Sequence, residues 1–356
     1  MRAGLRSRVG TCLVVVAMAA SACGAGVTST GSGGPPTRPA STGTGPDRGV
    51  QTRDLAVDKD AWVSVSVATL WRSPGSPRPV DAPALRHPVR VEQWLADMSL
   101  DQRRALNGRA DTQALLGDRV TVLALPSTRP RWARVAVPSQ PTPLDTRGYP
   151  GWVPRRQLTA TPPTSSSTRA TVLARTAWLL TDARDPARVF RVSMGTTLPV
   201  VGSTARYVRV ATPSGQLRRL AAGVVAVHET GRPALAPSRS SVVTTAKRFL
   251  GLPYLWAGAS GFGLDCSGLT SLVYRLHGIR IPRDAAPQSR HGTKVAHPGR
   301  GDLMFYAADG VVHHVSMYVG HGRMIHSPAT GTSVEIIATS TSPYAGEYVG
   351  ARHYLP

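Results

Sequence analysis

One cysteine of this chain is placed for chemistry. The 356 residues include three cysteines, and Cys12 and Cys23 both lie near the N-terminus, which leaves Cys266 as the one thiol in a region expected to fold. Exported proteins usually pair their cysteines or lack them, because an oxidising compartment makes a lone thiol a liability. Since the N-terminus predicts export, we interpret Cys266 as a candidate nucleophile. A small buried core residue is the alternative.

Cys266 also lies at the predicted start of a helix. Apolar residues recur on one helical face from Leu264 to Leu276, and Gly278 is a typical terminator. In the first turn of a helix, free backbone N–H groups and the positive end of the dipole stabilise a thiolate, so we predict a lowered cysteine pKa. The same N–H groups can hold the oxyanion of an acyl-transfer intermediate.

Histidines downstream can supply a base to this thiol. They are His313, His314, His321 and His326. Residues 311–320 alternate like a strand, so only one of His313 and His314 can face Cys266. His326 lies in a second strand-like run and can orient the imidazole of the base. A zinc site is the competing interpretation, but close Cys-x-x-Cys or His-Glu-x-x-His spacing is absent, so we expect no metal and no other cofactor.

Five short motifs follow one another in the last third of the chain. They are Pro253-Tyr254-Leu-Trp-Ala-Gly258, Asp265-Cys266-Ser267-Gly268-Leu269, Ile281-Pro-Arg283 with Gln288, Gly301-Asp302-Leu303, and His314-Val-Ser-Met-Tyr-Val-Gly320 followed by Met324-Ile-His326. This segment resembles the NlpC/p60 cysteine peptidases, which are papain-like enzymes that hydrolyse cell-wall peptides. The resemblance implies that Cys266 is the nucleophile, His314 the general base and His326 the third polar residue.

The same resemblance assigns the remaining residues of the segment. His313 and His321 become surface or turn histidines. Ala257 and Ser316 stand where many relatives carry glycine, and we expect both changes to be tolerated, because the extra methyl is small and Ser316 lies in a strand.

Short alternating apolar runs, separated by proline and glycine turns, predict two small all-β barrels before this segment. The first covers residues 54–158 and resembles bacterial SH3-like domains, with helices over 91–98 and 99–107 as an insertion. A second, weaker match covers 168–230. The fold class is therefore multidomain, with two small SH3-like barrels followed by an α+β papain-like NlpC/p60 domain at 238–356.

This arrangement resembles a subgroup of peptidoglycan hydrolases in which two SH3-like domains precede the peptidase. These endopeptidases cleave the bond between γ-D-glutamate and a diamino acid of stem peptides, and prefer a free N-terminal L-alanine. The resemblance implies that Tyr254, Asp265 and Ser267 bind the substrate's ammonium group, a task that suits an aromatic ring beside a carboxylate.

The first SH3-like domain of the subgroup supplies further substrate contacts, for which Asp118 and Tyr149 are the candidates. Each has a plain alternative, since Asp118 can be a turn residue and Tyr149 a barrel aromatic. Arg283 is either a surface salt-bridge partner or a substrate contact, and we leave it out of the catalytic set.

The N-terminus predicts export. Arg2, Arg6 and Arg8 precede an apolar run that is too short to span a membrane, which indicates a signal peptide over residues 1–22. The sequence around Cys23 resembles a lipobox, so we expect lipidation at Cys23, a flexible tether over 23–53, and a location at the outer face of the cytoplasmic membrane or in the cell wall. Plain secretion after Ala-x-Ala cleavage is the alternative.

A formal net charge of +22 favours anionic partners, such as cell-wall polymers or lipid headgroups. No predicted unit resembles a nucleic-acid-binding motif, so we expect no nucleic-acid partner. Two alternatives to peptide hydrolysis stay open. The protein could be a wall-binding lipoprotein without catalysis, or an acyl transferase that uses the same cysteine and histidine residues.

Overall fold

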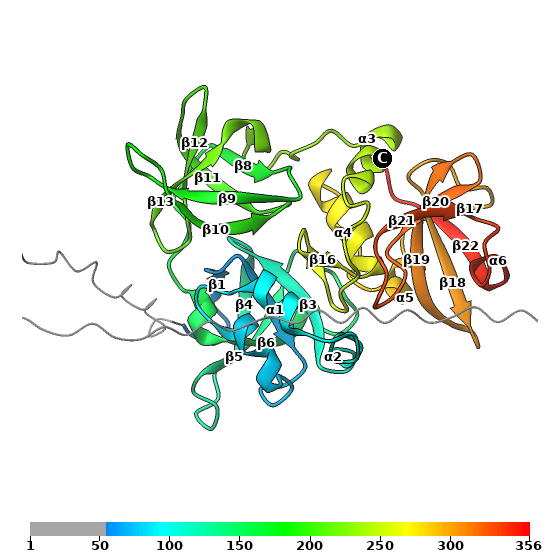
Figure 1. Ribbon diagram of the computed structural model, residues 1–356, viewed down its shortest axis with the longest axis horizontal. Coiled ribbons are helices and arrows are strands. Elements are labelled where there is room, and N and C mark those ends of the chain that lie inside the picture. Colours follow the sequence, from blue (N-terminus) through cyan, green and yellow to red (C-terminus); the bar gives the residue numbers. More distant parts are fainter. Residues whose placement is uncertain (1–54) are drawn as a thin grey trace, which may run out of the picture. The chain divides into compact units, whose positions relative to one another are not determined.

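The computed structural model of the protein describes residues 55–356 (Figure 1). The predicted signal peptide, Cys23 and the whole of the predicted tether lie outside the described residues. Within the described part, no helix is long and apolar enough to cross a membrane. Two seven-stranded sheets and one six-stranded sheet follow one another along the chain, with a two-stranded ribbon before the last.

The first β-domain is an antiparallel sheet with strand order β3-β2-β6-β5-β4-β1-β7. The predicted alternating runs form its strands, and their buried valines and leucines face one core that continues into the C-terminal domain. The strands are β1 (Asp60–Val63), β2 (Val67–Trp71), β3 (Ala110–Leu115), β4 (Arg119–Ala124), β5 (Trp132–Val137), β6 (Tyr149–Pro154) and β7 (Leu158–Thr159), with a 3-10 turn, η3 (Arg155–Gln157), before the last.

The predicted helical insertion lies between β2 and β3. It contains η2 (Pro79–Leu85), α1 (Val91–Asp97) and α2 (Leu100–Arg104). Ser99 caps α2, because its Oγ accepts the Gln102 N–H at 3.2 Å. Trp94 of α1 joins a small core that also holds Leu255 and Ala257, so the insertion packs against the segment that leads to Cys266.

The second β-domain repeats the seven-stranded antiparallel pattern, with strand order β10-β9-β13-β12-β11-β8-β14. It has its own smaller apolar core. Its strands are β8 (Thr168–Val172), β9 (Thr176–Thr181), β10 (Arg188–Ser193), β11 (Thr197–Ser203), β12 (Tyr207–Ala211), β13 (Leu217–Ala221) and β14 (Val225–Glu229), with η4 (Ala222–Val224) before the last.

The C-terminal domain packs helices against an antiparallel sheet with strand order β17-β22-β18-β19-β20-β21. Helix α4 lies against β19, the central strand that carries the predicted base. The elements are α3 (Arg239–Lys247), β15 (Ala259–Ser260), β16 (Gly263–Leu264), α4 (Cys266–Leu276), α5 (Ala285–Gln288), β17 (Thr293–Val295), β18 (Leu303–Ala308), β19 (Val311–Gly320), β20 (Arg323–His326), β21 (Glu335–Ala338), α6 (Tyr344–Glu347) and β22 (Tyr348–His353).

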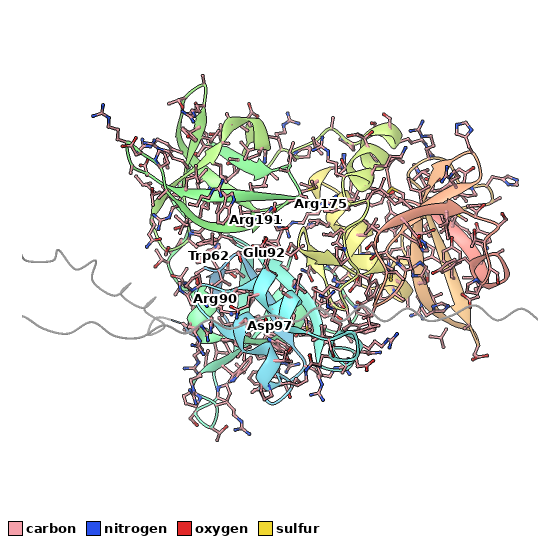
Figure 2. All side chains as sticks on the ribbon, in the orientation of Figure 1. Trp62, Arg90, Glu92, Asp97, Arg175 and Arg191 are labelled. Atoms are coloured by element: carbon pink, nitrogen blue, oxygen red, sulfur yellow. The ribbon has the colours of Figure 1, made fainter. Side chains whose placement is uncertain are left out.

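Specific hydrogen bonds join both β-domains to the C-terminal domain. From the first β-domain, Gln113 Oε1 accepts the Ala259 N–H at 3.1 Å and the Ser260 hydroxyl at 2.9 Å. From the second β-domain, Arg175, which is labelled in Figure 2, donates from its Nη2 to the Arg248 carbonyl at 2.9 Å. The first β-domain therefore bonds directly to β15, in the two-stranded ribbon just before Cys266.

Candidate active site

Cys266 is the first residue of α4, as the sequence predicts. Asp265 caps this helix, because its Oδ1 accepts the Gly268 N–H at 2.6 Å. Residue 268 has to be glycine, since a Cβ there would lie 2.0 Å from a backbone carbonyl oxygen. The N–H groups of Ser267 and Val315 donate to the Cys266 sulfur. Thus the Asp-Cys-Ser-Gly order fixes the thiol among backbone donors at the start of the helix.

Arg283 is buried, which corrects the interpretation of a surface residue. Its side chain is 1% exposed, and its guanidinium donates to both carboxylate oxygens of Asp265, at 3.0 and 2.7 Å. It also donates to Ser267 Oγ at 3.0 Å and, across the domain boundary, to Thr112 Oγ1 at 2.7 Å. Asp265 and Ser267, the predicted ammonium ligands, are therefore already bound within the protein.

Two buried histidines face each other across neighbouring strands. His314 comes from β19 and His326 from β20, and His314 Nε2 lies 3.0 Å from His326 Nδ1. This contact leaves His314 Nδ1 free of His326, and His314 lines the same cavity as Cys266. The geometry suits a base whose ring is held by a second ring, which is the role predicted for His326.

Two further side chains surround this histidine pair. The Tyr344 ring lies 5.1 Å from the His314 ring and 4.9 Å from the His326 ring, centroid to centroid. Glu335 lies opposite His326 in the register of β20 and β21, and its Oε1 is 3.5 Å from His326 Nε2. His326 Nε2 is buried without a hydrogen bond, and Glu335 is the one carboxylate of the described residues within 4.0 Å of it.

His313 and His321 lie where the alternation and the turn pattern predict. His313 is exposed on the other face of β19 and its Nε2 lies 3.2 Å from Glu347 Oε2, although its side chain reaches the rim of the Cys266 cavity. His321 is an exposed turn residue with a φ of 53°. Neither residue contacts the His314–His326 pair through a hydrogen bond in residues 55–356.

The two departures from glycine have different structural settings. Ser316 is buried in β19, and its hydroxyl lies 2.8 Å from the Tyr306 hydroxyl, so its polar group is satisfied. Ala257 adopts a φ of 64°, in the left-handed region that disfavours a residue with a Cβ. The backbone conformation, more than the size of the methyl group, explains why glycine suits position 257.

Burial favours the uncharged forms of Cys266, His314 and His326 at neutral pH. Burial, and then the Asp265 carboxylate, raise the pKa of the Cys266 thiol to about 12. Burial, followed by the neighbouring histidines, lowers the pKa of His314 to about 3, and burial lowers that of His326 to about 4. The predicted lowering of the cysteine pKa is therefore wrong for the substrate-free site, because desolvation outweighs the helix N-terminus.

The cavity at Cys266 has a volume of about 850 Å³ and is shared between two domains. Of the residues predicted from the sequence, it brings together Cys266, His314, Tyr254, Asp265, Ser267 and Tyr149. Tyr149 comes from β6, so the first β-domain forms part of the cavity wall. Within the described chain, no group of three or more histidine, cysteine or acidic residues is arranged to hold a metal ion.

Asp118 does not line this cavity. Its carboxylate accepts the Leu115 N–H at 2.9 Å in the turn before β4, and it forms a two-pronged ion pair with Arg275. Asp118 is therefore a turn residue, which was the alternative interpretation. The structure gives no support to a substrate contact at Asp118.

Two other acidic residues line the cavity instead, and sequence reasoning missed both. Asp111 projects from β3 and pairs with Arg72 at 2.9 Å. Asp284 follows Arg283 directly and is hydrogen-bonded to the Tyr149 side chain, while burial raises the pKa of its carboxyl group. The adjacent Ile281-Pro-Arg283 motif was the only available signal for Asp284, and no sequence signal marked Asp111.

A cysteine at a helix start, a histidine on the facing sheet and a second ring behind it define a papain-like cysteine peptidase. The chain belongs to the NlpC/P60 family. The NlpC/P60 family model matches residues 251–353, and the model of the YKFC SH3b2 domain matches residues 172–228. The predicted fold class, two SH3-like domains followed by an α+β peptidase, is confirmed.

Similarity to known proteins extends over most of the chain. This chain is 43% identical over 309 residues to the gamma-D-glutamyl-L-lysine dipeptidyl-peptidase of Bacillus cereus. The aligned residues cover 84% of this chain and 92% of that protein. The enzyme of the same name from Bacillus subtilis is 36% identical, with 81% and 96% covered. A crystal structure of an NlpC/P60 family protein from Bacillus cereus superposes with a TM-score of 0.79 at 42% identity, over 84% of this chain and 100% of that one.

Proposed function

We propose that the protein hydrolyses the bond between γ-D-glutamate and the diamino acid of peptidoglycan stem peptides, and so releases the N-terminal dipeptide L-Ala-γ-D-Glu. The observation that carries this proposal is the mixed lining of the Cys266 cavity, where the nucleophile and the base lie together with Asp111, Asp284 and Tyr149. The two similar Bacillus enzymes are named for dipeptide release from γ-D-glutamyl-L-lysine, which supports the same bond.

The chemistry begins from a neutral thiol and a neutral imidazole. Cys266 Sγ attacks the γ-carbonyl carbon of D-glutamate while His314 Nδ1 takes the thiol proton. The resulting imidazolium gives this proton to the departing amine of the diamino acid, which leaves a thioester on Cys266. Water then attacks the thioester with His314 as base, and the free γ-carboxylate and thiol are restored.

The residues around Cys266 and His314 lie where charge forms during the reaction, positive on the imidazole and negative on the oxyanion. The imidazolium forms in a buried setting that disfavours it, so the contact with His326 and the nearby Glu335 carboxylate act where positive charge appears. The Cys266 N–H, at the first helical position, has no acceptor within the helix and is free for the oxyanion.

The setting of Asp284 supports recognition of the free N-terminal amine of the peptide substrate. Its carboxyl group is partly desolvated beside the Tyr149 hydroxyl, and an ammonium group is the partner that would restore its charge. Asp265 is less suited to this task, since both of its oxygens already accept from Arg283. We therefore assign the ammonium site to Asp284, Asp111 and Tyr149, with Tyr254 beside them.

The test uses the intact protein, its Cys266→Ala variant and a Ser271→Ala control on the same helix. Each is incubated with L-Ala-γ-D-Glu-L-Lys, with the diaminopimelate analogue and with N-acetylated forms of both, and products are followed by mass spectrometry. We expect free diamino acid from the parent and the control only, and at least about tenfold faster cleavage of the free-amine peptides.

Other outcomes separate the remaining functions. Binding of peptidoglycan without cleavage of any peptide would favour a wall-binding protein. Products that join the dipeptide to an added amine or alcohol, without a free carboxylate, would favour acyl transfer. The ratio of rates on the lysine and diaminopimelate peptides identifies the diamino acid.

We also propose that the protein is exported and lipid-anchored at Cys23. The support is the charged N-terminus, the short apolar run and the lipobox-like sequence. The mass of the protein extracted from membranes is expected to exceed the cleaved chain by a diacylglyceryl group. A Cys23→Ser variant that stays equally membrane-bound would contradict the anchor.

A further inference from the structure

Arginine side chains line a second pair of cavities, remote from the catalytic chemistry. One has a volume of about 350 Å³ and the other of about 550 Å³, and the two adjoin, because Arg169, Thr197 and Arg275 line both. None of their lining residues lines the Cys266 cavity. We call the two cavities together the arginine groove, lined by Arg119, Arg169, Arg232, Arg275 and Arg280.

The charge of the arginine groove is only partly neutralised. Asp118 is the one acidic side chain among the lining residues, and Arg275 pairs with both of its oxygens. Arg169 donates to the Thr230 hydroxyl at 3.3 Å, and no ion pair joins it to a carboxylate of residues 55–356. Arg280 is exposed and likewise has no carboxylate partner in that part of the chain. Two guanidinium groups are therefore free to bind an anion.

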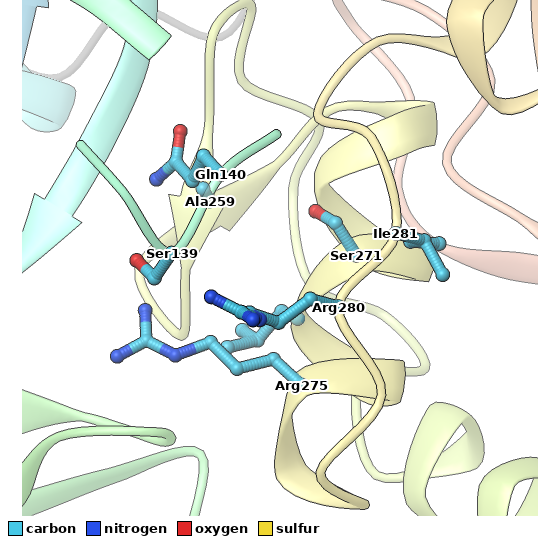
Figure 3. A pocket seen from close by; sticks show the side chains of 8 residues that line it. Ser139, Gln140, Ala259, Ser271, Arg275, Arg280 and Ile281 are labelled. Atoms are coloured by element: carbon cyan, nitrogen blue, oxygen red, sulfur yellow. The ribbon is translucent and has the colours of Figure 1, made fainter. Parts of the chain in front are cut away.

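The geometry keeps these like charges close to one another. Figure 3 shows Arg275 and Arg280 extending in the same direction, toward Ser139, and all three line both the small cavity drawn there and the 350 Å³ cavity. Burial lowers the pKa of Arg169, so its charge is disfavoured where it lies. An anion bound between these side chains would offset both effects, and the planar guanidinium fork matches phosphate and carboxylate oxygens.

We propose that the arginine groove binds an anionic glycopolymer, a linear chain of sugar or polyol units that carries phosphate groups. Two adjoining cavities can hold consecutive units of a polymer, whereas a single ion would fill only a small part of them. Trp62 lines the 350 Å³ cavity beside Arg119, its partner in the register of β1 and β4, and offers a flat apolar surface to a sugar ring. Trp62 is the one tryptophan, tyrosine or phenylalanine of the groove, whereas proteins that bind single-stranded nucleic acid stack successive bases on several such rings.

This site would hold the enzyme on the wall without occupying its active site. Since no residue is shared between the arginine groove and the Cys266 cavity, polymer binding and peptide cleavage are independent to first order. The proposal thus adds a binding function to the catalytic one and does not depend on which peptide is cleaved.

The probe is a fluorescently labelled poly(glycerol phosphate) oligomer, titrated into the intact protein and followed by anisotropy at two salt concentrations. The groove variant is Arg169→Gln with Arg280→Gln. The matched control is Arg90→Gln with Arg129→Gln, which makes the same charge change at two exposed arginines outside both cavities. We expect the groove variant to bind about tenfold or more weakly, the control to change little, and cleavage of the short peptide to be unaffected.

Four results would overturn the proposal. Equal weakening of both double variants would mean that net charge alone attracts the polymer. No weakening of the groove variant, with its melting temperature unchanged, would place binding elsewhere. An oligothymidylate of equal charge that binds as tightly, and loses as much in the groove variant, would remove the selectivity for glycopolymer. Tight binding of neutral dextran would remove the role of the anion.

Discussion

His314 Nε2 and His326 Nδ1 lie 3.0 Å apart between adjacent strands, so one ring must donate and the other accept. If His314 Nε2–H is the donor, His314 Nδ1 carries no proton and can act as the base for Cys266. His326 then carries its proton on Nε2, toward Glu335 Oε1 at 3.5 Å. In this assignment of protons, His326 is an acceptor that fixes the tautomer of His314.

Substitution of His326 tests the acceptor role. An asparagine keeps a side-chain oxygen that can accept from His314 Nε2–H, whereas alanine removes it. We expect His326→Ala to lower kcat/KM by about 100-fold and His326→Asn by about tenfold or less, with KM nearly constant in both. Steady-state kinetics on the free-amine tripeptide measure the difference. An equal loss in the two variants would assign His326 a packing role.

Glu335→Gln tests whether the charge behind His326 assists catalysis. The substitution preserves shape and removes a carboxylate that lies 3.5 Å from His326 Nε2 and is about half exposed. Because solvent screens the charge, we expect kcat to fall only about two- to fivefold, with a smaller effect at high salt. Glu347→Gln, at the partner of His313, is the matched control and is expected to leave kcat unchanged. Identical effects of both variants would dismiss a specific role.

The pH dependence of thiol alkylation tests the neutral resting state. Since the thiolate is the major form only above the thiol pKa, a pKa of about 12 leaves Cys266 almost entirely protonated at pH 7. We expect iodoacetamide to label Cys266 more slowly than free cysteine at pH 7, with a rate that still rises above pH 9. Peptide mapping after timed labelling separates Cys266 from the other cysteines. A rate plateau between pH 5 and 8 would instead indicate a thiolate–imidazolium pair.

The buried pair of Arg283 and Asp265 predicts a large loss of stability on substitution. Arg283→Ala leaves the Asp265 carboxylate buried without its partner, so the free energy of unfolding should fall by about 3–5 kcal/mol. The exposed pair of Arg104 and Asp101 provides the control, since Arg104→Ala should cost less than about 1 kcal/mol. Urea denaturation of both variants measures the contrast, and similar losses would argue against a structural role for Arg283.

Local sequence signals predicted the parts of the site that depend on local structure. The helix start at Cys266 follows from capping residues and apolar spacing, and the burial of His314 beside exposed His313 follows from strand alternation. The burial of Arg283 could not be predicted, because it depends on Thr112 from a different domain. The prediction of a lowered pKa for Cys266 was wrong for the same reason, because the desolvation of the thiol depends on the whole fold and not on the helix start alone.

The acidic residues near the site likewise could not be predicted from local sequence signals. Asp118, Asp111 and Asp284 have equivalent side chains, and only the packing of β3 and of the Arg283 segment decides which carboxylates face Cys266. A turn motif drew attention to Asp118, whose partner is Arg275. Residues brought together from two domains carry no shared spacing in the sequence, so the ammonium site emerges only from the structure.

Asp284→Asn tests that ammonium site through substrate affinity. A carboxyl group with a raised pKa is charged only above that pKa, so KM for the free-amine peptide should increase as the pH falls through the titration of Asp284. KM should also increase above about pH 8, where the substrate amine loses its proton. In Asp284→Asn we expect KM to be about tenfold higher at neutral pH, without the acidic increase and with little change for the N-acetylated peptide.

Asp185→Asn, at an exposed aspartate of the second β-domain, is the matched control. If Asp284→Asn raises KM equally for free and acetylated peptides, the residue shapes the cavity and the ammonium group is bound elsewhere.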